Sequence, residues 1–208
     1  DVSAASGLGN SSDVRCLQAA DIDNDGDTDL YVGNDEAVPN LFINNGNGTF
    51  TDMATAWGLF HSVSNYSACF GDYDRDGLLD LYLGVRTDEG LLSPNLLYHN
   101  LGGHFLEVGA AAGVDDLRLT LVAIFMDYNE DGWPDILCAN DKGNTYGPNE
   151  LFKNNGDGTF SDITREAGIV DLSGLLSIPE RNLGWSVVRK TGLTFHRPHF
   201  SVKGFPLL

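Results

Sequence analysis

Three nine-residue acidic stretches recur along this chain in fixed phase with a second motif, and this repetition constrains the fold more than any other feature. The stretches read DIDNDGDTD (21–29), DYDRDGLLD (72–80) and DYNEDGWPD (127–135). The second motif reads NLFINNGNGTFTDMATAWGL (40–59), NLLYHNLGGHFLEVGAAAGV (95–114) and ELFKNNGDGTFSDITREAGI (150–169). Self-similarity at intervals of 51 to 55 residues predicts an array of like units.

The closing part of the second motif occurs a fourth time at the start of the chain, as DVSAASGL. Asp1, Asp52 and Glu107 each precede the first aspartate of the next acidic stretch by 20 residues. We therefore expect the chain to open in the middle of a repeat.

The repeat pattern stops after residue 170. We expect residues 171–208 to be a divergent tail that is poorly ordered after 188. Residues 189–208 either come from an alternative or misread splice end, which is our hypothesis, or form an ordinary divergent tail.

Each period predicts about four short strands. In the second period, YSACFG leads into the acidic stretch, LLDLYLG leaves it, and NLLYH and HFLEV flank a glycine-rich hairpin signal. No stretch keeps an apolar 3.6-residue period long enough for a sizeable helix, although ATAWGL and TREAGI could each form a single turn. Four-strand units of roughly 40–55 residues are typical of β-propeller blades.

We therefore predict an all-β fold made of β-propeller blades of about four antiparallel strands. About three blades would form an incomplete ring, with a partial blade over 1–13 and repeats near 14–65, 66–119 and 120–170.

The acidic stretches have the residue pattern of calcium-binding loops. Aspartate or asparagine occupies positions 1, 3, 5 and 9, and glycine occupies position 6, where it can adopt positive φ. Alternate side chains of such a loop can converge on one centre, and the backbone carbonyl of position 7 can join them. Calcium takes 6–8 oxygen ligands at about 2.3–2.6 Å, whereas magnesium prefers a smaller octahedron and zinc prefers thiols or imidazoles.

We predict about three Ca²⁺ ions. Their ligands would be Asp21, Asp23, Asp25, Asp27 and Asp29; Asp72, Asp74, Asp76, Leu78 and Asp80; and Asp127, Asn129, Asp131, Trp133 and Asp135.

The acidic stretches have two alternative interpretations. An EF-hand shares the opening spacing but needs a glutamate at position 12 and helices on both sides. Position 12 here is Val32, Leu83 or Cys138, each in an apolar run, so we expect the loops to join strands and the position 9 carboxylate to close each site. The second alternative is an aspartate- and glycine-rich turn without metal.

Charge and composition exclude several partners. The net charge is -18, and thirteen of the 30 acidic residues lie in the three stretches, so negative charge gathers where a cation would bind. This balance argues against nucleic acid and anionic membrane surfaces. No apolar run approaches the roughly 20 residues of a membrane span. Cys16, Cys69 and Cys138 lie in apolar runs and are expected to be buried free thiols.

Other residues that could carry chemistry have plainer interpretations. NNGNGTF and NNGDGTF join strand to strand without a lysine or a helix start, so they are hairpins and not phosphate-binding loops. The histidines lack zinc-binding spacing and are expected at the surface, with His99 aligned to Asn44 and Asn154. These histidines are His61, His99 and His104.

Recurring aromatic residues are expected in the core of the blades. They are Phe50, Phe105 and Phe160, with Trp57 and Trp133 either in the core or beside a ligand face. Glycosylation sequons stand at Asn10, Asn47 and Asn65, and Asn47 is placed at a hairpin tip.

Together, D-x-D-x-D-G-x-x-D between strands and the following LFxNNGxGTFxDxTxxAG resemble the FG-GAP/VCBS repeat over residues 1 to about 170. The motifs are most similar to those of the cartilage acidic protein and UnbV (ASPIC) group, and integrin α-chain propellers use similar loops. Members of that group typically continue into a distinct C-terminal domain. The resemblance implies a calcium-binding β-propeller that is secreted or on a cell surface.

From these features we expect an extracellular scaffold for protein or glycan binding or adhesion, with no catalysis of its own. The alternative is a fragment of a propeller-containing extracellular lyase or hydrolase whose catalytic residues lie elsewhere. A purely structural or chaperone-like array is a further alternative.

Overall fold

The computed structural model of the chain describes residues 1–10, 12–87, 92–141 and 147–169. Its regular structure consists of three four-stranded sheets and two four-residue helical turns. The expected tail over 171–208 lies outside the described residues. The first sheet contains β1 (Val14–Ala20), β2 (Asp29–Asn34), β3 (Asn40–Asn44) and β4 (Phe50–Asp52); the second contains β5 (Asn65–Gly71), β6 (Asp80–Val85), β7 (Leu96–Asn100) and β8 (Phe105–Glu107); the third contains β9 (Thr120–Met126), β10 (Asp135–Asn140), β11 (Glu150–Asn154) and β12 (Phe160–Asp162).

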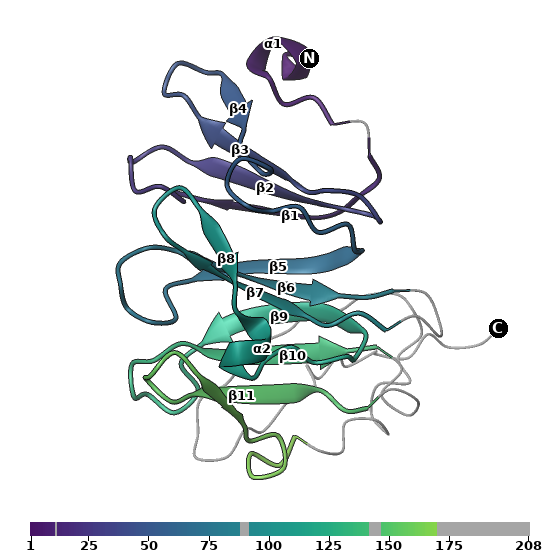
Figure 1. Cartoon of the computed structure of the whole chain (residues 1–208), viewed down its shortest axis with the longest axis vertical. Helices are drawn as coiled ribbons and strands as arrows, with labels where there is room; N and C mark the ends of the chain where they lie inside the picture. Colours follow the sequence, from purple (N-terminus) through teal and green to yellow (C-terminus); the bar gives the residue numbers. More distant parts are fainter. Residues whose placement is uncertain (11, 88–91, 142–146, 170–208) are drawn as a thin grey trace, which may run out of the picture.

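Every sheet is an antiparallel meander in which the strands pair in chain order. Figure 1 shows the three sheets stacked along the long axis of the molecule, with the first strands β1, β5 and β9 running beside one another. The prediction of an all-β fold with four antiparallel strands per unit is therefore confirmed. The described residues form no closed ring, which is consistent with an incomplete set of propeller blades.

One helical turn precedes the first sheet, and the other lies between the second and third sheets. They are α1 (Ser3–Ser6) and α2 (Gly109–Ala112). Within the described part of the chain, no helix is long and apolar enough to cross a membrane.

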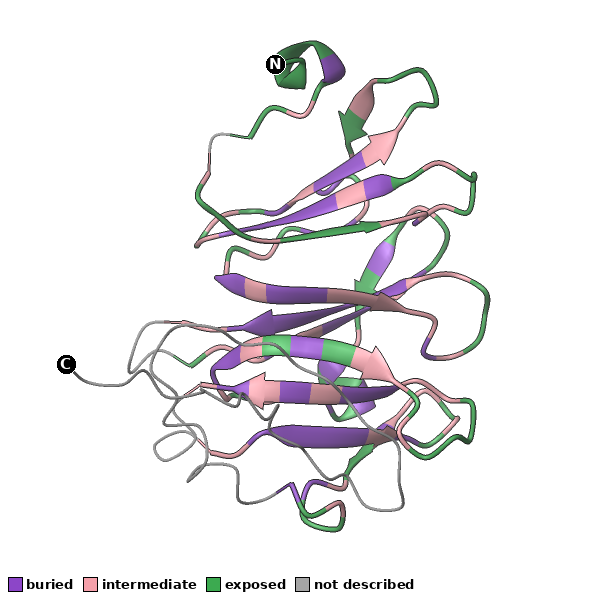
Figure 2. Ribbon diagram, turned by 180° about the vertical axis from the view of Figure 1, so that it is seen from behind, coloured by how far each residue is buried: buried purple, intermediate pink, exposed green. Residues whose placement is uncertain are grey.

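The hydrophobic core lies between neighbouring sheets. Side chains alternate across a strand, and β6 of the middle sheet shows this directly: Leu81 and Leu83 enter the core shared with the first sheet, while Tyr82 enters the core shared with the third. All six residues of β6 are buried because this sheet is covered on both faces (Figure 2). Burying one such leucine contributes about 1.5–3 kcal/mol, so stacking stabilises every sheet.

The phenylalanine that begins the fourth strand of each sheet contributes to this core. Phe105 and Phe160 are buried, as predicted, whereas Phe50 in the first sheet is only half-buried, since the described residues before that sheet form no further sheet to cover it. Trp57 packs on the first core, with its ring centroid 6.4 Å from that of Phe105.

The turns that follow β4 and β8 pack against the fourth strand of the next sheet. The glycines of these turns have positive φ, and a Cβ on Gly58 would collide with the carbonyl oxygen of Phe105. The backbone N–H of Phe105 also donates to the Trp57 carbonyl at 2.7 Å. Gly7, in the motif fragment at the start of the chain, approaches the Phe50 carbonyl in the same way. The recurring A-x-G-[LVI] sequence thus encodes sheet-to-sheet contact.

In the second and third sheets, an asparagine at the end of the third strand links the sheet to the acidic loop of the preceding sheet. Asn100 donates from Nδ2 to the Ile22 carbonyl at 3.1 Å. Asn154 donates to the Tyr73 carbonyl at 2.8 Å and also to the Pro134 carbonyl at 3.0 Å. Asn44, at the same position of the first sheet, donates to Thr28 within its own sheet.

This register corrects the alignment of His99 with Asn44 and Asn154. The residue in that position is Asn100, because the hairpin of the second sheet is one residue shorter: Leu101 N–H bonds to the His104 carbonyl, whereas Asn45 N–H bonds to the Thr49 carbonyl. His99 therefore occupies the position of Ile43 and Lys153.

The predicted surface position is correct for one of the three histidines. His104 is exposed, but His61 and His99 are half-buried. The cysteine prediction is also correct only in part: all three are free thiols, and Cys138 is buried, whereas Cys16 and Cys69 are half-buried.

Replacing Asn154 with alanine should lower the free energy of unfolding by about 1–3 kcal/mol, because two carbonyls would lose their donor in a buried place. Chemical denaturation at fixed metal concentration measures this change. Asn155→Ala is the matched control, since Asn155 is exposed and its amide donates within its own hairpin. Equal losses for the two variants would contradict the linking role.

His61 gives the fold a specific pH dependence. Its ring lies between Tyr98 Oη, 2.8 Å from Nδ1, and Asn65 Nδ2, 3.0 Å from Nε2. Burial lowers the pKa of His61 to about 4, below its ordinary value of 6.5, so the folded state holds the neutral ring. The stability from this group is complete above pH 6.5 and is lost as the pH falls toward 4, by up to about 1.4 kcal/mol per pH unit.

The variant His61→Gln should lack this component. The difference in unfolding free energy between wild type and variant should shrink steadily from pH 6.5 to pH 4.5, and denaturation curves across that range measure it. Since the aspartates titrate in both proteins, the subtraction isolates His61. A difference that does not change with pH would contradict the assignment.

Candidate metal centres

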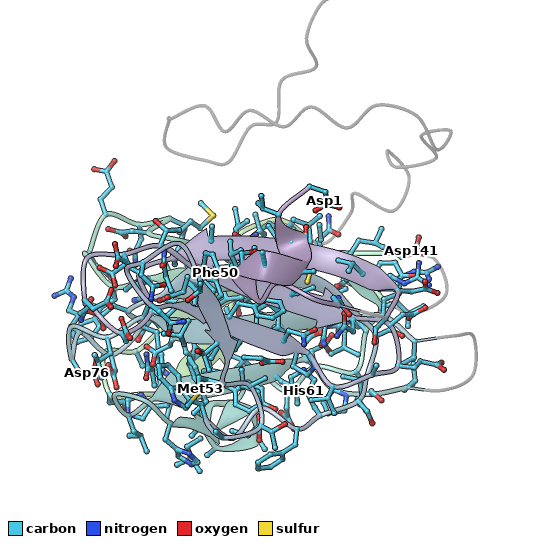
Figure 3. All side chains as sticks on the ribbon, turned by 90° about the horizontal axis from the view of Figure 1, so that it is seen from above. Asp1, Phe50, Met53, His61, Asp76 and Asp141 are labelled. Carbon is cyan, nitrogen blue, oxygen red and sulfur yellow. The ribbon has the colours of Figure 1, made fainter. Side chains whose placement is uncertain are left out.

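The three acidic stretches join the first and second strands of the three sheets, and Figure 1 shows these loops projecting from one edge of the stack. Figure 3, seen along the stack, places Asp76 of the second loop at this edge and Asp141 at the opposite one. Each loop follows a first strand and ends where the buried second strand begins. The prediction that the loops join strands is confirmed, since position 12 lies within β2, β6 or β10.

The three loops share one backbone conformation. Position 6 is Gly26, Gly77 or Gly132, with φ between 86° and 94°. Position 4 also has positive φ, 61° to 62°, although its residues are Asn24, Arg75 and Glu130. Positive φ is uncommon outside glycine and asparagine, so arginine and glutamate there show that the loop geometry overrides local preference.

Backbone N–H groups hold the carboxylates in place inside each loop. The position 1 carboxylate accepts a hydrogen bond from the position 6 glycine, at 3.0 Å in the first loop, 3.1 Å in the second and 2.9 Å in the third. The position 5 carboxylate accepts one from the position 7 N–H at 2.8–2.9 Å. These bonds neutralise only part of the negative charge, because an N–H is a dipole and not a cation.

The position 9 aspartates are fully buried and have a structural role that the sequence did not reveal. They are Asp29, Asp80 and Asp135. One oxygen of Asp29 accepts from the Ile22 N–H of its loop at 2.9 Å, and the other accepts from the Asn44 N–H of the third strand at 2.8 Å. Asp80 and Asp135 repeat both bonds. This carboxylate therefore joins the loop to the hairpin, whatever else it binds.

Carboxylates converge in the first two loops. Asp21, Asp23 and Asp29 offer oxygens that all lie within 4.8 Å of one another, and so do Asp72, Asp74 and Asp76. In the second loop, Asp72 Oδ1 is buried without a hydrogen-bond partner among the described residues, whereas the matching oxygen in the first loop accepts the Asp25 N–H. A buried, unpartnered carboxylate oxygen beside two further carboxylates fits a hard cation.

In the third loop, an amide and a lysine partly compensate the negative charge of the carboxylates. Asn129 replaces an aspartate and donates from Nδ2 to Asp131 Oδ2 at 2.8 Å, and Lys153 Nζ lies 3.9 Å from the same oxygen. The pKa of Asp131 lies below its ordinary range, chiefly because the Trp133 N–H bonds to the carboxylate. Among the described residues, Asp127, Asp131 and Asp135 do not form a three-carboxylate cluster like those of the other loops.

Burial, together with neighbouring carboxylates, raises the pKa of three carboxyls in the loops. Burial, followed by repulsion from Asp29 and Asp25, raises the pKa of Asp23. Burial raises the pKa of Asp80 to about 7 against the effect of its hydrogen bonds. Burial also raises the pKa of Asp135. In each case the ionised form is disfavoured, and a bound cation would reverse that preference.

His99 is the site residue that sequence reasoning missed. Its Nδ1 lies 3.2 Å from Asp80 Oδ1 and 3.3 Å from Asp74 Oδ2, and the three residues form a further cluster with metal-ligating atoms. The signal was obscured because the shortened hairpin shifted the alignment by one residue. The matching Lys153 of the third sheet also points to its loop, so this strand position places a side chain beside the acids.

Neighbouring loops contact each other through position 4. Asn24 donates from Nδ2 to the Gly77 carbonyl of the second loop at 2.8 Å. Arg75 lies over the Trp133 ring of the third loop, with its guanidinium carbon 4.3 Å from the ring centroid. Trp133 is thus a contact between loops; whether its carbonyl, or those of Asp27 and Leu78, binds metal stays a prediction.

Comparison with protein families gives a match to the family described as FG-GAP-like repeat, over residues 7–83 and 127–186. The matched segments cover all three acidic loops and the whole of the first sheet. The stretch between them contains β7, the shortened hairpin, β8 and β9, and the second sheet nevertheless has the same strand order as the other two. No match was found among curated proteins.

Proposed function

The chain belongs to the FG-GAP-like repeat family, and on this premise we propose that it is an extracellular β-propeller scaffold whose blades bind calcium and which binds a protein or glycan ligand. Domains with these repeats are β-propeller-like and often extracellular. Within the family, the combined motifs favour the cartilage acidic protein and UnbV (ASPIC) group.

The observation that carries the calcium proposal is the convergence of carboxylates in the first two loops, with one buried oxygen of Asp72 left without a partner. All the ligands that the loops supply at positions 1, 3, 5 and 9 are oxygens, which calcium prefers. Asp21, Asp23 and Asp29 would hold one ion, and Asp72, Asp74, Asp76 and Asp80 another.

A third ion would bind at Asp127, Asn129, Asp131 and Asp135, bringing the total to about three. We propose that this site is the weakest, because the Asn129 amide and Lys153 already satisfy part of the Asp131 carboxylate. Bound calcium would supply the positive charge that the crowded carboxyls lack, and so would stabilise the loops that connect the sheets.

We propose that the chain has no catalytic activity of its own. Its carboxylates are committed to the loops and to the hairpin contacts of position 9. Its thiols are held in the protonated form, since burial raises the pKa of Cys16 to about 11 and that of Cys138 to about 12. A protonated, enclosed thiol is a poor nucleophile.

The calcium proposal predicts opposite effects for two matched substitutions at position 3. Asp23→Asn should weaken calcium binding at the first loop, while Asn129→Asp should strengthen it at the third, because a carboxylate replaces an amide that now donates to Asp131. A site filled at a hundredfold excess over Kd stabilises the fold by about 2.7 kcal/mol, and Asp23→Asn should lose up to that share. Titration calorimetry with CaCl₂ and melting temperatures measure both effects.

The same Asp23→Asn variant should be as stable as wild type, or more stable, in the presence of a strong chelator, because it removes one member of a crowded cluster. Magnesium at equal concentration is the control ion. A wild-type melting temperature that is indifferent to the chelator would sink the calcium proposal.

The scaffold proposal is tested by ligand binding with and without calcium. Binding to a glycan array, or retention of secreted proteins in a pull-down from conditioned medium, should be lost when calcium is chelated and restored when it returns. Turnover of a polysaccharide or peptide by the purified chain would instead favour the enzyme alternative.

A further inference from the structure

The hairpin between β3 and β4 carries the sequence Asn47-Gly48-Thr49 at its tip. Figure 1 shows this hairpin extending from the edge of the first sheet. Asn47 is exposed, and a Cβ built on Gly48 would meet no atom within 4 Å. The tip therefore has open space around it on the folded molecule.

Hydrogen bonds orient the Asn47 side chain. Its Oδ1 accepts from the Thr49 N–H at 3.0 Å and from the Thr49 hydroxyl at 2.6 Å. Its Nδ2 donates no hydrogen bond within the described residues. The nitrogen is thus the free end of the amide, and the threonine of the sequon is already in contact with the asparagine.

The other two sequons differ in this respect. Asn65 is fully buried in β5, and its Nδ2 lies 3.0 Å from His61 Nε2. An oligosaccharide there could not be accommodated by the folded sheet. Asn10 is exposed, but its Nδ2 donates at 2.9 Å to Oδ1 of the buried Asn34. Of the three sequon asparagines, Asn47 alone combines an exposed side chain with an amide nitrogen that donates no hydrogen bond among the described residues.

We propose that Asn47 is an N-glycosylation site and that Asn65 is not modified in the folded protein. The proposal rests on the extracellular location in the proposed function, but not on calcium binding. The donor would be a lipid-diphosphate-linked oligosaccharide in the secretory pathway. Asn47 Nδ2 forms a bond to the anomeric carbon and loses a proton, while the bond from that carbon to the diphosphate breaks and the lipid diphosphate leaves.

The third sheet supplies a matched hairpin that differs at the critical atom. Asp157 takes the place of Asn47, and its Oδ1 accepts from the Thr159 N–H at 3.1 Å and from the Thr159 hydroxyl at 2.6 Å. A Cβ on Gly158 also meets nothing within 4 Å. This hairpin has the same hydrogen bonds as the hairpin of the first sheet, but its aspartate has no amide nitrogen. Asp157→Asn should therefore create a second site, and Asn47→Asp should remove the first while keeping the hairpin bonds.

The test is secretion of the full chain from cultured human cells behind a signal peptide, in an Asn10→Gln background so that Asn10 does not contribute. Intact mass before and after digestion with peptide N-glycosidase should show one glycan, mapped to Asn47 by peptide sequencing. Asn47→Asp should lose it, Asn65→Gln should keep it, and Asp157→Asn should carry two.

An absence of enzyme-sensitive mass on Asn47 would overturn the proposal, as would a glycan on Asn65 of the folded, secreted protein. A single glycan on Asp157→Asn would overturn the argument from hairpin geometry. Calcium titration of unglycosylated protein from bacteria tests the proposed function separately, so that failure of one proposal is distinguishable from failure of the other.

Discussion

The rest of the structure depends on the two hydrogen bonds that the buried aspartate at the end of each acidic loop accepts. Asp29, Asp80 and Asp135 each accept one N–H from the loop and one from the third strand, so a single side chain fixes the loop, the second strand and the hairpin together. The asparagine that donates this second N–H then reaches the preceding loop through its own amide in the second and third sheets. The acidic loops are therefore part of the stacking of the sheets, and any ion bound in them would act on the whole array.

This arrangement concentrates charge at one edge of a chain whose net charge is already -18. The three loops meet the resulting repulsion differently. In the first loop, burial and the neighbouring carboxylates raise the pKa of Asp23. In the second, His99 approaches two carboxylates, and in the third, Asn129 and Lys153 supply local compensation. Three loops with one backbone thus differ in how much they gain from a cation, because electrostatics depends on the neighbours that each sheet provides.

Much of this could be predicted from the sequence, since the informative signals are local and repeated. Alternating apolar residues, asparagine–glycine turns and the fixed interval gave the strands, the hairpins and the position of the loops. The errors arise where side-chain contacts join different strands or loops. A hairpin shorter by one residue moved His99 beside Asp80, and the burial of His61 depends on Tyr98 and Asn65 from other strands. The stacking of Arg75 on Trp133 also joins two loops, which no pattern within one repeat could indicate.

The turns after β4 and β8 pack forward, onto the next sheet along the chain. The stack consequently has a direction. A sheet contacts the turn of the preceding sheet, and its own turn contacts the following sheet. Units joined in this way interact only with their immediate neighbours, so a duplication of one whole period would insert a sheet without requiring any new kind of contact. The gene for such a protein could gain or lose single repeats while the remaining interfaces between sheets stayed the same.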